Sequence, residues 1–167
     1  MRFYRIKATF LIIFGVFFPM TVQACSEPAH RHFDFWLGNW HVYTPSGDLA
    51  GENLISKTLK DCVIEEYYTT ASGFAGKSIN MYNKHSQQWQ QMWVDNTGTM
   101  LTLIGGLNEH GDMVLSAAGK SSQGEPLTHR ITWTPKKDGT VRQHWQMQLS
   151  HHNDWQTVFD GIYKKRD

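Results

Sequence analysis

The sequence predicts an all-β protein: a single antiparallel, up-and-down β-barrel of about ten strands. Short segments rich in β-branched and aromatic residues recur along the chain, and turn residues separate them at spacings of about 8 to 12 residues. No amphipathic helical stretch of convincing length interrupts them. The composition agrees, because 13% aromatic and 19% charged residues suit pleated surfaces that are half buried against one another.

The expected strands follow one another in a meander, joined by short turns that contain Gly, Asn, Asp and Pro. Turns of this kind join antiparallel neighbours. The final segment, VFDGIYKK, is expected to pair beside the first strand and so remove the free edges of the sheet. The expected strands are residues 40–44, 49–60, 62–71, 77–83, 88–96, 100–107, 112–118, 126–135, 140–150 and 154–164.

The first 24 residues are expected to be a secretory signal peptide, cleaved after Ala24. Basic residues at Arg2, Arg5 and Lys7 precede an apolar run over residues 8–20, and the small-residue end Val22-Gln23-Ala24 follows it. The apolar run is too short to span a bilayer comfortably. We therefore expect one mature domain, residues 25–167, in the periplasm or secreted, with no membrane span after the signal is removed.

The two cysteines, Cys25 and Cys62, allow two interpretations. In an oxidising compartment they can form a disulfide, which would attach the N-terminal tail to the barrel wall. Alternatively, VQAC is a loose lipobox, Cys25 carries lipid, and Cys62 is a buried free thiol. We favour the disulfide, because a free thiol is uncommon in a secreted chain.

The composition also limits the partners. A formal net charge of +1 gives no electrostatic basis for binding nucleic acid. The nine histidines show no recognised metal-ligand spacing, and His30, His32, His151 and His152 are expected to be solvated. We expect no metal, no cofactor, and a monomer or weak dimer. No Gly-x-Ser-x-Gly or other complete catalytic motif is present, so the catalytic residues, if any, stay unknown.

Period-2 alternation gives strand faces that mix aromatic and polar residues, as a barrel with a cavity allows. In QWQQMWVDN, for example, Trp93 and Gln91 share a face. Same-face residues of neighbouring strands lie side by side, so we expect one contiguous patch that either forms a self-satisfied hydrogen-bond network or contacts a polar ligand. If it contacts a ligand, Glu66 and Asp95 are the one plausible acid–base pair. The candidate ligand-binding residues are Glu66, Tyr68, Asn80, Tyr82, Trp89, Gln91, Trp93 and Asp95.

These features favour a barrel that binds a small, partly apolar molecule in its interior. Two alternatives stay open. One is an enzyme, an isomerase or hydrolase, that uses a cavity carboxylate. The other is an envelope structural or interaction module without a ligand, which predicts a filled interior. The volume of the barrel interior distinguishes them.

The first expected strand begins with Gly38-Asn39-Trp40, which resembles the opening Gly-x-Trp of lipocalin-like barrels, the calycins. In addition, FDFWLGNW, CVIEEY, SINMY, WQQMWVDNTG, ITWTP, DGTVRQHW and VFDGIY together resemble a family of exported bacterial proteins with a lipocalin-like domain of unknown function. The resemblance runs from about Cys25 to Tyr163. One departure is Tyr68, where the family pattern has tryptophan.

The resemblance implies a lipocalin-like fold, export, and a Cys25–Cys62 bridge. It also implies structural roles at the closed end. Gly38 would permit a close turn and Trp40 would plug the barrel, covered by a basic side chain from a late strand, for which Arg142 is the candidate. Phe33, Phe35 and Trp36 are expected to form a short aromatic segment that covers the same end.

Overall fold

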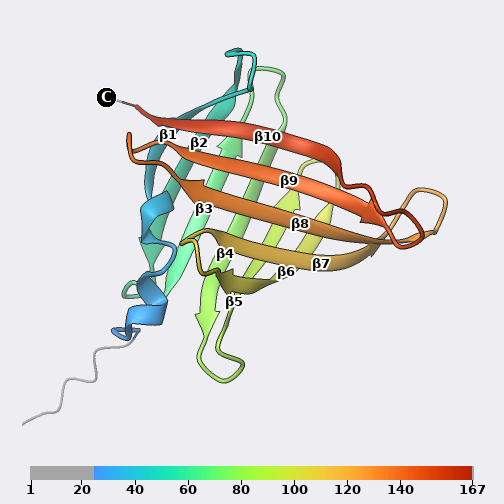
Figure 1. Ribbon diagram of the computed structural model, residues 1–167. Helices are drawn as coiled ribbons and strands as arrows, with labels where there is room; N and C mark the ends of the chain where they lie inside the picture. Colours follow the sequence, from blue (N-terminus) through green and yellow to red (C-terminus); the bar gives the residue numbers. More distant parts are fainter. Residues whose placement is uncertain (1–24, 167) are drawn as a thin grey trace, which may run out of the picture.

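The structure is a computed structural model that describes residues 25–166 (Figure 1). The predicted signal peptide, residues 1–24, lies outside the described residues. Within residues 25–166, ten strands form one closed antiparallel barrel, which confirms the predicted fold class. The strands are β1 (Gly38–Tyr43), β2 (Leu49–Thr58), β3 (Val63–Thr69), β4 (Ala75–Asn83), β5 (Gln88–Asp95), β6 (Met100–Leu107), β7 (Met113–Lys120), β8 (Pro126–Pro135), β9 (Val141–Leu149) and β10 (Gln156–Lys165).

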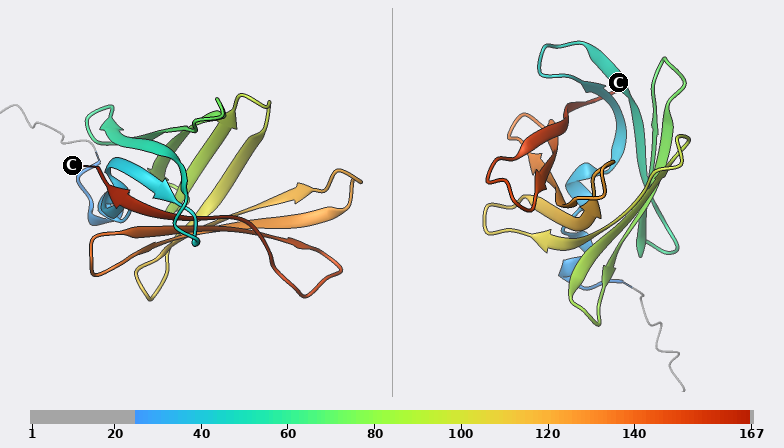
Figure 2. Two further views of the ribbon diagram at one scale, coloured as in Figure 1. Left: turned by 90° about the horizontal axis from the view of Figure 1, so that it is seen from above. Right: turned by 90° about the vertical axis from the view of Figure 1, so that its right-hand side faces the viewer.

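Each strand pairs with its neighbours in the sequence, and β1 pairs with β10 to close the barrel. Val42 lies opposite Tyr163 of β10 on one side and Gly51 of β2 on the other. The last strand therefore closes the sheet as predicted. In the right-hand view of Figure 2 the strands curve round a central axis. The expected and observed strand ends differ slightly, as at β1, which begins at Gly38 because that residue already pairs with Ile55.

An aromatic segment covers one end of the barrel, as predicted. Its backbone forms two short 3-10 helices, η1 (Pro28–Arg31) and η2 (Asp34–Trp36), seen in blue beside one end of the strands (Figure 1). Phe33 and Trp36 are fully buried and stack with ring centroids 4.8 Å apart. Both rings also contact Trp133. None of the helical segments in residues 25–166 has the length and apolar character needed to cross a membrane.

The base of the barrel is closed by Trp40, whose buried indole donates a 2.9 Å hydrogen bond to the Trp36 carbonyl. The expectation that Arg142 covers this ring is wrong. The ammonium of Lys165 lies over it, 4.0 Å from the ring centroid. Arg142 instead forms two hydrogen bonds, of 2.8 and 2.7 Å, with Asp160. The reason is strand parity, because position 142 alternates with inward-facing neighbours on β9.

The Cys25–Cys62 disulfide is present, with Cα atoms 5.2 Å apart. Both sulfur atoms lie in the bridge, so this structure leaves no thiol on Cys25 for a lipid. The bridge joins the N-terminal segment to the turn between β2 and β3, where the Arg31 guanidinium also donates hydrogen bonds to the carbonyls of Cys25 and Asp61. A disulfide of this kind is typical of an oxidising environment.

The histidines of the N-terminal segment are less exposed than expected. His30 is buried, with 7% of its surface exposed, and its ring packs edge-on against Tyr82 at 5.1 Å. The prediction of a solvated tail is therefore wrong at this position, because η1 turns the side chain into the barrel. His151 and His152, by contrast, are exposed, as expected for residues in a turn.

Strands β6 and β7 pair over only part of their length. Their register runs from Ile104 opposite Ser116 to Leu107 opposite Met113, whereas β7 and β8 pair from Met113 to Lys120. The first half of β6 and the second half of β7 thus diverge toward the end opposite η1 and η2. The cavity lies at the same end of the barrel.

Candidate functional site

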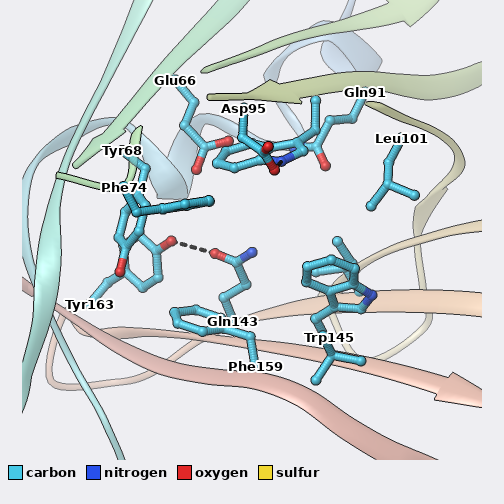
Figure 3. Close-up of a pocket in the computed structure, with 13 residues that line it drawn as sticks. Glu66, Tyr68, Phe74, Gln91, Asp95, Leu101, Gln143, Trp145, Phe159 and Tyr163 are labelled. Carbon is cyan, nitrogen blue, oxygen red and sulfur yellow. Dashed lines mark hydrogen bonds between the residues drawn. The ribbon is translucent and has the colours of Figure 1, made fainter. Parts of the chain in front are cut away.

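The barrel encloses a cavity of about 210 Å³ on the side away from the N-terminal segment. Phe74, Asp95 and Val158 belong to its rim, since they lie at or beside strand ends opposite η1 and η2. Figure 3 shows the labelled side chains pointing into a common space from both halves of the barrel. Of the described residues, six with aromatic rings line the cavity: Tyr68, Phe74, Trp93, Trp145, Phe159 and Tyr163.

Glycines on the strands make room for two of these rings. A Cβ atom at Gly76 would lie 2.1 Å from the indole of Trp93, and one at Gly51 would lie 2.7 Å from the Tyr68 ring. Each ring therefore lies against the backbone of a glycine, and a larger residue in place of that glycine would push the ring away. The two glycines thus help to set the positions of Trp93 and Tyr68 in the cavity wall.

A buried polar network forms the floor of the cavity. Its centre is Glu66 of β3, which lies directly opposite Ser78 of β4. The Ser78 hydroxyl donates a 2.6 Å hydrogen bond to Glu66 Oε2, and the Asn53 amide donates a 2.7 Å hydrogen bond to Oε1. Asn80 and Gln91, which are also paired across strands, extend the network through a 2.8 Å bond from Gln91 Nε2 to Asn80 Oδ1.

The environment of Glu66 changes its acidity. Only 5% of the residue is exposed, and burial raises the pKa of its carboxyl group from 4.5 to about 7, partly offset by the hydrogen bonds from Ser78 and Asn53. Burial penalises the charged form, while hydrogen bonds to the carboxylate favour it. Both protonation states of Glu66 are therefore populated near neutral pH.

Tyr163 connects this network to the opposite wall of the barrel. Its hydroxyl accepts a 3.1 Å hydrogen bond from Asn53 Nδ2 and donates one to Gln143 Oε1 of β9, the dashed line in Figure 3. Burial, together with the nearby charge of Glu66, raises the pKa of Tyr163 well above its ordinary value. The hydroxyl group thus stays protonated and remains a hydrogen-bond donor.

Asp95, the second carboxylate of the cavity, has a different environment. It lies at the end of β5 and its Oδ1 accepts hydrogen bonds from Thr97 and from the backbone of Thr99. Its Oδ2 accepts a 3.1 Å bond from the indole of Trp93. Burial would raise the pKa of Asp95, but these hydrogen bonds outweigh it and hold the pKa below the ordinary value. Asp95 is therefore ionised at neutral pH.

The structure brings most, but not all, of the predicted ligand-binding residues together. Glu66, Tyr68, Gln91, Trp93 and Asp95 line the cavity. Asn80 is buried in the polar network beside them but is not part of the lining.

Tyr82 and Trp89 face the same interior at another level. The Trp89 indole donates a 3.1 Å hydrogen bond to the carbonyl of Ala29, and the Tyr82 ring packs against His30. Both residues therefore support the covered end of the barrel rather than the cavity.

The opposite wall of the cavity was missed from the sequence. The missed residues come from β6, β8, β9, β10 and the turn between β3 and β4. The parity of β9 was a usable signal, because Gln143 and Trp145 share a face in TVRQHWQMQL. The lining residues outside the predicted set are Phe74, Leu101, Ile131, Gln143, Trp145, Val158, Phe159 and Tyr163.

Within residues 25–166, no group of three or more His, Cys, Asp and Glu side chains is arranged to hold a metal ion. One histidine lies close to the cavity wall: His129, whose Nδ1 accepts a 3.1 Å hydrogen bond from the Trp145 indole. Burial lowers the pKa of His129, so the ring is neutral at neutral pH.

In comparisons with known proteins, no family model matches the chain, and no curated protein matches its sequence.

Proposed function

We propose that this protein binds a small, partly apolar molecule inside its barrel. The observation that carries the proposal is the cavity of about 210 Å³, which combines aromatic walls with a polar floor. Binding pockets commonly have mostly apolar walls and a few polar groups that orient the ligand. The volume lies below the ~300–1,000 Å³ usual for drug-sized ligands, so the ligand is small. An envelope module without a ligand would need no such space.

Export to the periplasm or the cell exterior is part of this proposal. The Cys25–Cys62 bridge supports it, because disulfides persist in oxidising compartments. The sequence of residues 1–24, which has the pattern of a signal peptide, supports it independently. The resemblance to exported lipocalin-like proteins agrees with a closed up-and-down barrel that carries a covering segment at one end.

Binding is tested by NMR of the tryptophan indoles during titration with 2-phenylethanol, a neutral single-ring probe. We expect the resonances of Trp93 and Trp145, which line the cavity, to shift. Trp36 and Trp133 lie fully buried at the covered end and serve as internal controls. Leu101→Trp should fill the cavity and abolish the shifts, whereas Ile104→Trp on the exposed face of the same strand should not. Unchanged indole resonances in the wild type would contradict the proposal.

A second candidate function is an isomerase or hydrolase that uses Glu66 as its acid or base. The observation that favours it is the pKa of about 7 of Glu66 on the cavity floor. A general acid or base works best when its pKa is close to the working pH. The test is a panel of small esters and ketones: turnover should change with an inflection near pH 7, disappear in Glu66→Gln, and persist in Glu65→Gln. Equal rates for the wild type and Glu66→Gln would exclude this role.

A further inference from the structure

The charged groups of the cavity all have the same sign. Among the described residues that line it, Glu66 and Asp95 carry carboxylates, and none is a lysine, arginine or histidine. Burial in a low-dielectric site strengthens the effect of such charges on a ligand. The lining therefore disfavours an anionic ligand such as a fatty acid or a phosphate ester.

Three basic side chains on β8 and β9, the strands that form one wall of the cavity, have partners within the protein. Arg142 is paired with Asp160, and the guanidinium of Arg130 stacks on the Trp155 ring at 3.8 Å while it donates a hydrogen bond to Gln146. His129, behind Trp145, uses Nδ1 as an acceptor and is neutral. None of these groups supplies a positive charge to the cavity.

The carboxylate of Glu66 retains capacity for a further donor. It accepts hydrogen bonds from Asn53 and Ser78 within the described chain, and a carboxylate has about four acceptor positions. Its neighbours in the cavity are the aromatic residues Tyr68 and Tyr163. Aromatic faces attract cations, most strongly where water is excluded. Carboxylates and ring faces together are the chemistry that recognises an ammonium group.

We propose that the ligand is a small organic cation, an amine with one ring or a short alkyl group, whose nitrogen lies between Glu66 and the aromatic rings. This inference rests on the proposed function of binding in the cavity. The space equals that of roughly seven water molecules at ~30 Å³ each, which suits a single-ring amine rather than a lipid. Asp95 at the rim adds a second negative charge on the path of entry.

The test is calorimetric titration of the mature protein at pH 8, where Glu66 is ionised, with three probes of similar shape. They are 2-phenylethylamine, which is cationic, 2-phenylethanol, which is neutral, and 3-phenylpropionate, which is anionic. We expect the amine to bind roughly tenfold to hundredfold more tightly than the alcohol, as for hydrogen bonds to a charged group. The anion should bind more weakly than the alcohol.

Matched variants assign this preference to the carboxylates. Glu66→Gln should reduce the affinity for the amine to that for the alcohol, whereas Glu65→Gln, an exposed neighbour on the same strand, should leave both affinities unchanged. Asp95→Asn tests the rim without altering the buried network and should weaken amine binding about threefold. Its control is Asp138→Asn, which removes a carboxylate that holds a similar turn through Thr140.

The outcomes separate the inference from the proposed function. If the alcohol binds as tightly as the amine, or if Glu66→Gln leaves the preference for the amine intact, the cationic ligand is wrong while binding in the cavity stands. If none of the three probes binds and no indole resonance of Trp93 or Trp145 shifts, both proposals fail. Preferential binding of the amine that is lost in Glu66→Gln supports both.

Discussion

The hydroxyl of Ser78 donates a 2.6 Å hydrogen bond to Glu66 from the position directly opposite it on the neighbouring strand. This bond and the one from Asn53 offset part of the free energy lost when the carboxylate is buried. The network leaves Glu66 with a pKa of about 7. The consequences for stability and for the cavity can be measured separately.

The first prediction concerns stability against pH. The folded pKa of Glu66 is raised from 4.5 to about 7, so between these values the folded protein holds a proton that the unfolded chain has released. The contribution of Glu66 to stability is fully present below pH 4.5 and is lost as the pH rises to 7, by about 3 kcal/mol in total. In denaturant unfolding, the free energy of unfolding of the wild type should fall more steeply with rising pH over this range than that of Glu66→Gln. Glu65→Gln should behave as the wild type. Parallel curves for all three proteins would contradict it.

A second prediction concerns the glycine beneath Trp93. Gly76→Ala places a Cβ atom 2.1 Å from the indole, so the ring must move into the cavity or the strands must separate. We expect a loss of about 1–3 kcal/mol in the free energy of unfolding and loss of binding of 2-phenylethanol. Gly106→Ala on β6 is the matched control, because nothing lies within 4 Å of the added atom. If both variants bind the probe equally, Gly76 does not position the ring.

The third prediction concerns the cation over the barrel base. Lys165→Met removes the ammonium 4.0 Å from the Trp40 ring centroid and its hydrogen bond to the Leu37 carbonyl. We expect the free energy of unfolding to fall by about 1 kcal/mol. Lys164→Met, which removes a cation from the outer ring of Tyr43 at 4.9 Å, should change it by under about 0.5 kcal/mol. The measurement is urea unfolding followed by the Trp40 indole resonance in NMR. Equal losses of stability in Lys165→Met and Lys164→Met would contradict the prediction.

The fourth prediction concerns the Cys25–Cys62 bridge. It closes a loop across a sequence separation of 37 residues, which corresponds to about 3–4 kcal/mol in the chain-entropy model. Reduction should lower the free energy of unfolding by this order and loosen the N-terminal segment, detected as faster amide exchange at Phe33 and Trp36. The double variant Cys25→Ala/Cys62→Ala should be as unstable as the reduced wild type, and reductant should not change its free energy of unfolding. Identical unfolding with and without reductant in the wild type would show that the bridge adds no stability.

Strand periodicity was sufficient to predict the architecture of the barrel. Alternation and turn residues located all ten strands of the described region, with shifts only at their ends. The Lys165–Trp40 contact was harder to predict. The resemblance to calycins implies a basic residue over the tryptophan, but Arg142 does not take this role because strand alternation turns position 142 outward on β9.

The candidate site was predicted in part, because parity gives the face of a strand but not the depth along the barrel axis. Tyr82 and Trp89 have the inward parity of Asn80 and Gln91, yet they lie one level nearer the N-terminal segment. Depth depends on the stagger between strands, which is set by the closure of the whole barrel. For the same reason, Tyr163 could not be placed opposite Glu66 from local patterns.

The pairing of β1 with β10 also determines when in synthesis this protein can acquire its structure. Trp40 pairs with Lys165 and Tyr43 with Ile162, so the edge of β1 that faces β10 stays unpaired until almost the entire chain has been made. Until then the nascent polypeptide has at most an open sheet with two unpaired edges, and contacts over such sequence separations form slowly. The barrel can therefore close only after synthesis of the chain is nearly complete.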